Sequence, residues 1–281
     1  MFGMRRMCDP VLGTAEINQF VHHGYVVVKN CFSPDTARHW VEEAFVKQSY
    51  SIDDPSTWDA PYVSMEATKS VDLKAFSPKA VKTIWQLLGG ESRVSNKISF
   101  SDHFVINFSW NANQPWRAPS NALGTWHLDA WEAGCRHFLN SPELALVLIV
   151  MWTDVAPRSG GTFISSDSIG PVTRHLLEHP EGVLNKEETN NFFGDLIFDF
   201  HSFVELTGRV GDIAFMHPYT LHAQSDNPSG HARVITNEHI QLSEPMHFNR
   251  ASSLEYSPVE RAVLDSLEVQ SVDFERSTAC Q

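Results

Sequence analysis

The sequence has little of what marks several protein classes. It contains four cysteines in 281 residues, and because none of them forms a CxxC pair, neither a zinc ribbon nor a disulfide framework is indicated. Its longest apolar run is Leu144–Trp152, far shorter than the roughly 20 residues of a membrane helix. Lys and Arg number 21 against 34 Asp and Glu, and the resulting formal charge of −13 argues against partners such as nucleic acid or an anionic membrane.

These absences favour a protein of the reducing cytosol. No apolar stretch follows Arg5 and Arg6, so we expect no secretory signal, and the scattered cysteines suit a reducing compartment. Hydrophobic residues make up 42% and charged residues 20% of the chain, as in ordinary globular proteins. We therefore expect one domain over residues 1–281, large enough to bury roughly three quarters of the unfolded surface.

The first third of the chain predicts helices around one short strand. The apolar β-branched run Tyr25–Val28 is typical of a strand. The pairs Ser33-Pro34 and Ser77-Pro78 combine a capping residue with proline at the first helical position, which marks a helix start. We expect a helical N-terminal part over about residues 14–90.

From about Val94 the pattern changes to short strands separated by turn residues. This spacing is typical of an antiparallel sandwich or barrel of the jelly-roll, cupin-like class. A helix and polar loop over 171–190 interrupt the barrel, which spans about 94–245, and the capping box at Ser257 predicts a C-terminal helix over about 257–268. The predicted strands are Ser101–Ser109, Thr125–Asp129, Ala145–Trp152, Gly161–Ser165, Phe198–Leu206, Asp212–Met216 and Arg233–Gln241.

The segment Trp126-His127-Leu128-Asp129 carries the first candidate metal ligands. In a strand, residues i and i+2 point to the same face, so His127 and Asp129 would converge on one side, with Trp126 turned towards the core. An imidazole and a carboxylate placed in this way can occupy two neighbouring positions around a divalent metal. His-x-Asp alone is a weak signal, because such tripeptides occur by chance.

A second segment, Gly211–Ala223, runs from a Gly-Asp turn through an apolar strand to His217 and His222. Either histidine would complete a set of two imidazoles and one carboxylate. Such a set on one octahedral face leaves three positions open, which is typical of non-haem iron(II) oxygenases.

On the strand that follows, Arg233 can receive a carboxylate, because the planar guanidinium pairs both oxygens at once. Asn107, on an earlier strand, and Thr162, after the Gly160-Gly161 turn, are candidates for further polar contacts. The far carboxylate of 2-oxoglutarate is the natural partner for this group.

With these residues the chain resembles the phytanoyl-CoA dioxygenase family of 2-oxoglutarate-dependent oxygenases, over nearly its whole length. The matching motifs are Phe20–Val28 with the helix after Ser33, the His127-x-Asp129 segment, and Gly211 through His222 to Arg233. The resemblance implies a double-stranded β-helix that uses iron(II), 2-oxoglutarate and oxygen, with ascorbate as an accessory reductant. It also implies His127, Asp129 and His222 as ligands, and Arg233 as the co-substrate anchor, with Thr162 and Asn107 as lesser contacts.

The chain departs from the family pattern at one wall of the site. Many members continue the glycine-rich turn with Pro-Gly-Ser-His, whereas this chain reads Gly161-Thr162-Phe163-Ile164-Ser165-Ser166-Asp167-Ser168. Asp129 is retained, whereas family halogenases replace that carboxylate with a small residue, so we do not expect halogenation. The expected reaction is oxidation of an unactivated C–H bond, most simply hydroxylation, with desaturation or cyclisation as variants of it.

Other interpretations stay open at this point. The same fold could hold a different metal for hydrolysis, could be a cupin-type dioxygenase that needs no 2-oxo acid, or could bind a ligand without catalysis. His217 is the rival to His222 and would otherwise be a packed histidine. Arg117, in the loop before the first motif, would either meet an acidic substrate or have no role. The acidic charge favours a specialised small metabolite over a CoA thioester.

Overall fold

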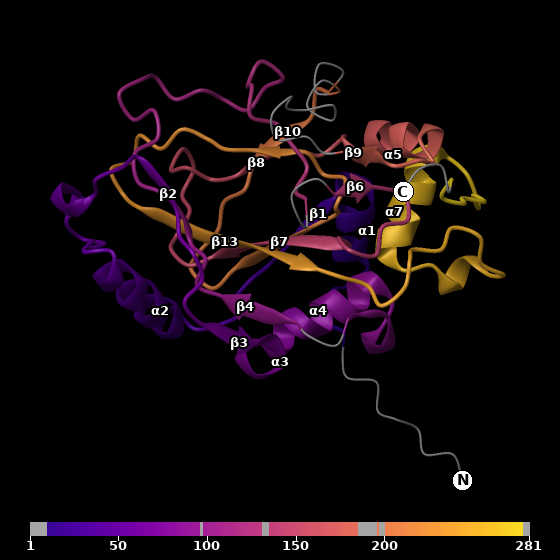
Figure 1. Cartoon of the computed structure of the whole chain (residues 1–281), viewed down its shortest axis with the longest axis horizontal. Coiled ribbons are helices and arrows are strands. Elements are labelled where there is room, and N and C mark those ends of the chain that lie inside the picture. Colours follow the sequence, from indigo (N-terminus) through magenta and orange to yellow (C-terminus); the bar gives the residue numbers. More distant parts are fainter. Residues whose placement is uncertain (1–9, 96–97, 131–134, 185–195, 197–199, 278–281) are drawn as a thin grey trace, which may run out of the picture.

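The computed structural model describes residues 10–95, 98–130, 135–184, 196 and 200–277. It is mainly β, with antiparallel sheets and helices around them (Figure 1). The described helices are α1 (Thr14–His23), α2 (Pro34–Lys47), α3 (Leu73–Phe76), α4 (Pro78–Leu88), α5 (Ile169–Glu178) and α7 (Pro258–Leu267), with 3₁₀ turns at Pro55–Thr57, Glu91–Arg93 and Ser253–Glu255.

The strands form one large sheet, one three-stranded sheet and two short pairs. The large sheet has the order β1-β11-β7-β13-β5-β2 and the smaller one β10-β8-β12, while β3 pairs with β4 and β6 with β9. The strands are β1 (Tyr25–Val28), β2 (Tyr62–Ser64), β3 (Ser70–Asp72), β4 (Ser99–Ser101), β5 (Val105–Asn107), β6 (Arg136–His137), β7 (Leu146–Met151), β8 (Phe163–Ser165), β9 (Val183–Leu184), β10 (Phe203–Glu205), β11 (Ile213–Met216), β12 (His222–Ala223) and β13 (Arg233–Ile240).

Two layers of sheet enclose the interior in which the candidate ligands lie. Figure 1 shows β8 and β10 on one side of β7 and β13, with α2, α3 and α4 on the other. Every residue of β7 is buried, as its apolar sequence predicts. Leu148 and Val150 belong to the large core cluster that includes the helices, whereas Val147 and Ile149 join Ile164 of β8 in a smaller cluster. One face of β7 therefore packs on helices and the other on the second sheet.

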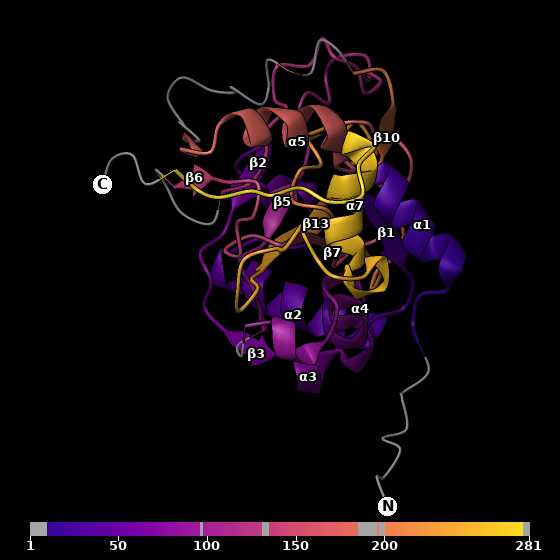
Figure 2. The same cartoon turned by 90° about the vertical axis from the view of Figure 1, so that its right-hand side faces the viewer.

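The helix starts follow the predicted capping. Ser33 Oγ accepts a hydrogen bond from Thr36 N over 3.1 Å, and Ser77 Oγ accepts one from Ala80 N over 3.2 Å. Ser257 forms the predicted capping box at the start of α7. This last helix packs against α1 and α5 at one end of the molecule (Figure 2).

The first third contains more strand than the sequence predicts. Besides β1, it holds β2 and β3, and both β1 and β2 lie at the edges of the large sheet. β2 and β3 are only three residues long each, so they offer no alternating pattern that a sequence could reveal. The part predicted to be helical thus supplies both edge strands of the sheet.

Three predicted strands are wrong in extent. Thr125–Asp129 is not a strand, because His127 forms only an isolated bridge to His222. Ser101–Ser109 is divided into β4 and β5 by a turn in which the Asp102 carboxylate accepts backbone N–H bonds from Thr68 and Lys69. Phe198–Leu206 shrinks to β10, with the predicted start at Phe198 outside the described residues.

The bounds of the other predicted strands agree with the observed strands to within two residues. Helix α5 lies in the predicted insertion, whose residues 185–190 are outside the described part of the chain. The fold class, mainly β with flanking helices, is confirmed. Within the described ranges, no helix is long and apolar enough to cross a bilayer.

Candidate metal centre

The structure brings His127, Asp129 and His222 together. One nitrogen of each imidazole and one carboxylate oxygen all lie within 4.8 Å of one another. Asp129 Oδ1 is 3.2 Å from His222 Nε2 and 3.7 Å from His127 Nε2. The three residues form the only group of three or more potential metal-ligating side chains among the described residues.

Backbone pairing explains how residues so far apart in sequence meet. His127 N donates to His222 O, and His222 N donates to His127 O, each over 3.0 Å. His222 in turn lies opposite Ile164 of β8. The isolated bridge therefore ties the first motif to the edge of the small sheet, and the next residue but one, Asp129, points to the same side as His127.

Both imidazoles are oriented by backbone carbonyl groups. His127 Nδ1 is 2.8 Å from Thr125 O, and His222 Nδ1 is 3.3 Å from Thr220 O. Because a carbonyl only accepts, each Nδ1 carries a proton, and Nε2 is the nitrogen through which each ring would bind a metal once that nitrogen is deprotonated. This is the tautomer that a divalent metal requires, held by the kind of contact that commonly fixes metal-bound histidines.

The electrostatics of the cluster favour an ionised carboxylate. Burial alone would raise the pKa of Asp129, but the charge and hydrogen bond of His222 and the hydrogen bond of His239 hold that pKa well below its usual range. Burial likewise lowers the pKa of His222, and the Asp129 carboxylate more than offsets it, so the pKa is raised. An anionic oxygen beside two imidazole nitrogens is a donor set suited to iron(II).

The cluster opens into a cavity between the two sheets. Its volume is about 130 Å³, and its walls come from both layers and from β2: Tyr62, Val105, Thr125, His127, Thr162, His222, Ala223, Gln224, Arg233, Ile235 and Asn237. The His127 side chain is 43% exposed and that of His222 only 3%. Solvent therefore reaches the cluster from the His127 side.

Arg233 lies at the first position of β13, buried in the wall of this cavity. Its Nε donates to Gly160 O over 2.7 Å and one terminal nitrogen to Val105 O over 3.1 Å, and the Tyr62 side chain lies beside the guanidinium in the cavity wall. Burial lowers the pKa of Arg233 to about 10, which leaves it charged at neutral pH. No acidic side chain of the described residues forms an ion pair with it.

The two lesser candidates, Thr162 and Asn107, differ in whether they line the cavity. Thr162 lines the cavity. Asn107 is fully buried but does not line it; its Nδ2 donates to Ser225 O over 2.9 Å and its Oδ1 accepts from Trp110 N over 3.0 Å. Asn107 thus holds two loops together, and its predicted contact with a co-substrate has no support in this geometry.

Three further residues singled out in the sequence have hydrogen-bond or ion-pair partners elsewhere in the protein. His217 is fully buried, with Nε2 3.2 Å from Val259 O and Nδ1 accepting from Tyr219 N. Arg117 pairs with Asp226 through Nε and a terminal nitrogen over 2.9 and 2.7 Å. Trp126 is buried and donates to Ser120 O, as its position next to His127 predicts.

Three residues that the sequence pattern did not single out, His239, Gln224 and Tyr62, lie at the site. His239 Nε2 is 3.1 Å from Asp129 Oδ2. Gln224 Nε2 is a buried amide nitrogen of the cavity wall for which the described residues provide no hydrogen-bond partner. The alternation of β13 could have indicated His239, because it lies on the same face as Arg233.

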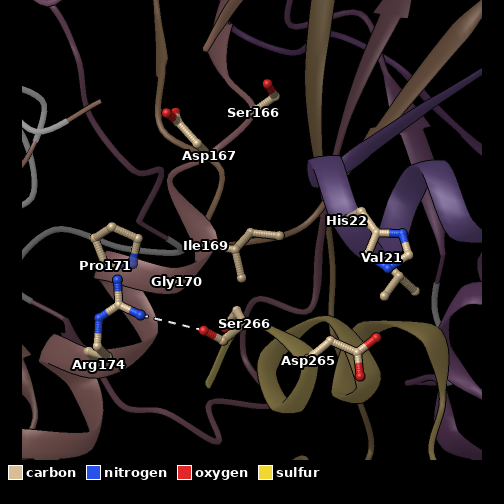
Figure 3. A pocket seen from close by; sticks show the side chains of 10 residues that line it. All are labelled: Val21, His22, Ser166, Asp167, Ile169, Gly170, Pro171, Arg174, Asp265 and Ser266. Carbon is tan, nitrogen blue, oxygen red and sulfur yellow. Dashed lines mark hydrogen bonds between the residues drawn. The ribbon is translucent and has the colours of Figure 1, made fainter. Parts of the chain in front are cut away.

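A second cavity, of about 290 Å³, lies between α1, α5 and α7 and shares no lining residue with the first (Figure 3). Arg174 contacts Ser266 O across it over 3.4 Å. Asp167, the carboxylate on its α5 side, already accepts the backbone N–H bonds of His201 and Ser202. This cavity contains no group of metal-ligating side chains among the described residues.

Comparison with known families agrees with this geometry. A family model described as phytanoyl-CoA dioxygenase (PhyH) matches residues 20–235, a range that holds the three clustered residues and Arg233. The chain belongs to the phytanoyl-CoA dioxygenase family. The predicted family and enzyme class are thereby confirmed: the protein is an iron(II)- and 2-oxoglutarate-dependent oxygenase.

No curated protein matches the sequence. Among solved structures, the apo form of EctD from S. alaskensis is 17% identical with a TM-score of 0.48, covering 83% of this chain and 78% of that one. The non-heme alpha-ketoglutarate-dependent carbocyclase SnoK from nogalamycin biosynthesis is 19% identical with a TM-score of 0.47, covering 82% and 84%.

Proposed function

We propose that His127, Asp129 and His222 hold the iron(II) of this oxygenase and that Arg233 anchors 2-oxoglutarate for the oxidation of a C–H bond in a small metabolite. Both Nε2 atoms and Asp129 Oδ1 face one another. Two imidazoles and one carboxylate leave three metal positions open, which suits a chelating 2-oxo acid together with oxygen. Iron in such a site couples decarboxylation of 2-oxoglutarate to succinate with oxidation of the substrate.

The single observation that carries the assignment of the co-substrate is the surroundings of Arg233. A buried cation without an ion-pair partner is costly unless a ligand supplies the missing charge. Arg233 lines the same cavity as His127 and His222, and a guanidinium binds a carboxylate through two parallel hydrogen bonds. The distal carboxylate of 2-oxoglutarate meets both requirements, since its other end is free to reach the metal.

Two further residues of the cavity wall favour an anionic ligand. Gln224 Nε2 is a hydrogen-bond donor with no protein partner in the described chain, and Thr162 adds a hydroxyl group. An unsatisfied buried donor costs about 1–3 kcal/mol, which an accepting oxygen would relieve. The wall thus offers donors where the co-substrate has only acceptors.

The substrate approaches from the side on which His127 is exposed. The cavity itself, at about 130 Å³, is smaller than the 300 Å³ or more of a typical pocket for a drug-sized molecule. Co-substrate would fill much of it, so the substrate must lie over its mouth. The net charge of −13 disfavours an anionic CoA thioester, and we favour hydroxylation of a specialised metabolite.

The competing functions leave the buried cation unexplained. A metal hydrolase, a cupin-type dioxygenase without a 2-oxo acid and a non-catalytic binding protein have no need of an anion receptor beside the metal. Asp129 is present, so the carboxylate position is not vacated for a halide. The intact set of ligands together with Arg233 favours 2-oxoglutarate chemistry over all three.

Succinate formation tests this proposal without a known substrate. Purified protein with iron(II), oxygen and 2-oxoglutarate should release succinate slowly, and Arg233→Gln should require far more 2-oxoglutarate. Arg117→Gln is the matched control, because Arg117 is paired with Asp226 away from the cavity wall. Absence of succinate from iron-loaded wild-type protein, or equal 2-oxoglutarate dependence in both variants, would contradict the proposal.

A further inference from the structure

The carboxylate of Asp129 is held at both oxygens, by different partners. Oδ1 faces the two histidines of the cluster, 3.2 Å from His222 Nε2 and 3.7 Å from His127 Nε2. Oδ2 points the other way and is 3.1 Å from His239 Nε2. His239 itself is outside the group whose ligand atoms lie within 4.8 Å of one another. It therefore contacts a metal ligand without being placed as one.

We propose that His239 is a positioning residue, which donates a hydrogen bond from Nε2 to Asp129 Oδ2 and so restricts the carboxylate to binding metal through Oδ1 alone. This inference rests on the proposed function only in that it requires a divalent metal at His127, Asp129 and His222. An ionised carboxylate has no proton to give, so His239 must be the donor.

Restricting the carboxylate to one oxygen has a consequence for the reaction. A carboxylate that binds through both oxygens occupies one more metal position than a carboxylate that binds through one. The chemistry needs three open positions, two for the chelating 2-oxo acid and one for oxygen. By occupying Oδ2, His239 keeps the third position from being taken by the protein itself.

The sheet holds His239 firmly enough for this role. It lies opposite Val147 of β7 near the end of β13, within a pairing with β7 that runs from Ile235 to Ile240. On the same strand, Arg233, Ile235 and Asn237 line the cavity, and His239 follows at the next alternate position. One strand thus carries both the co-substrate anchor and the group that orients the metal ligand.

Cobalt(II) binding to the metal-free protein tests the inference without turnover. His239→Gln keeps an amide N–H near the position of Nε2, whereas His239→Met has similar length and no donor. Loss of such an outer partner commonly weakens metal binding 10- to 100-fold. We expect that loss of cobalt(II) affinity in the Met variant and recovery to within a few-fold of wild type in the Gln variant, by calorimetric titration.

The visible spectrum of bound cobalt(II) gives a second readout, because its intensity falls as coordination number rises. We expect a weaker spectrum in His239→Met, as Oδ2 becomes free to bind, and a wild-type spectrum in His239→Gln. If the Met variant does not fold when metal-free, His239→Asn replaces it, since its shorter amide cannot reach Oδ2. His103→Met is the control: that histidine is 32% exposed, against 28% for His239, and contacts Asn237 O rather than Asp129.

Equal cobalt(II) affinity and spectra in wild type and both His239 variants would overturn the inference, as would equal losses in the Gln and Met variants. Failure of the proposed function is distinguishable: it appears as absence of succinate from wild-type protein. The difference between the Gln and Met variants in cobalt(II) binding does not depend on that result.

Discussion

The stretch from the end of β11 to the start of β12 carries two buried histidines in different surroundings. Both ring nitrogens of His217 are engaged by backbone atoms, one with Val259 of α7 and one with Tyr219. His222 uses only Nδ1 on a backbone carbonyl and turns Nε2 towards Asp129 and His127. The sequence offers the same residue type at both places, and what separates a packed histidine from a candidate ligand is one nitrogen that faces another candidate ligand instead of the backbone.

The two arginines near the site differ in the same way. Arg117 is half-exposed, and its guanidinium is paired with the Asp226 carboxylate. Arg233 is buried, and its neighbours are backbone carbonyls and Tyr62. The Arg233 guanidinium thus has no carboxylate partner among the described residues, whereas the Arg117 guanidinium has one. A buried cation without an opposite charge is costly, so the surroundings of Arg233 favour an anionic ligand in this cavity.

The largest effect is expected from removing a residue of the cluster. His222→Ala or Asp129→Ala should lower bound iron(II), measured after equilibrium dialysis, to background, and succinate formation should vanish. His217→Gln should retain iron(II) at the wild-type level, because neither of its ring nitrogens faces the cluster. Iron retained by His222→Ala but lost by His217→Gln would reverse the roles of the two histidines.

The next effect distinguishes the two arginines. Arg233→Gln removes a charge-assisted pair with the co-substrate, worth about 3 kcal/mol, so the 2-oxoglutarate concentration for half-maximal succinate release should rise roughly 100-fold. The iron affinity of this variant should not change. A shift of less than about threefold would show that Arg233 does not contact the co-substrate.

Lowering the pH should reveal how the low pKa of His217 affects the stability of the fold. Burial lowers its pKa to about 3, whereas in the unfolded chain an imidazole titrates near 6.5. Between those values the unfolded state binds the extra proton, so stability falls as pH decreases, by up to about 1.4 kcal/mol per pH unit from this group. Urea unfolding of the metal-free protein between pH 6.5 and 4.5 should show a shallower fall for His217→Gln; parallel pH profiles would contradict this account.

The smallest effect concerns Arg117. Arg117→Met leaves the buried Asp226 carboxylate with its hydrogen bond to Asn111, and since the arginine side chain is 55% exposed, solvent screening limits the loss to about 1 kcal/mol of unfolding free energy. Denaturant unfolding measures it. Iron and 2-oxoglutarate binding should be unchanged; a large loss of 2-oxoglutarate binding would instead place Arg117 at the site.

The features that could be predicted from the sequence are those that depend on the spacing of residues close together in the chain. The continuous apolar run of β7, the proline-marked starts of α2 and α4, and the family motifs around His127 and His222 each occupy a few consecutive residues. The side-by-side placement of His127 and Asp129 also held, although the segment is a single bridge and not the predicted strand. Two residues spaced by two need only local extension to point the same way.

What the sequence does not reveal depends on register between distant strands. His239 meets Asp129 across 110 positions, and Tyr62 reaches Arg233 from the three-residue strand β2 at the sheet edge. Neither pairing leaves a local pattern. The predicted role of Asn107 has no support for the same reason, because only the fold shows that its amide spans the Ser225 and Trp110 backbones. The cytoplasmic location and the use of ascorbate stay predictions.

Anaerobic absorption spectroscopy tests the central claim most directly. When 2-oxoglutarate is added to the iron(II)-loaded protein without oxygen, direct chelation of the metal should give a visible charge-transfer band. We predict this band for wild type and for His217→Gln, and its absence for Asp129→Ala. Iron-loaded wild-type protein that gives no band, or an Asp129→Ala variant with a band of equal strength, would contradict the assignment of this cavity as the iron and 2-oxoglutarate site.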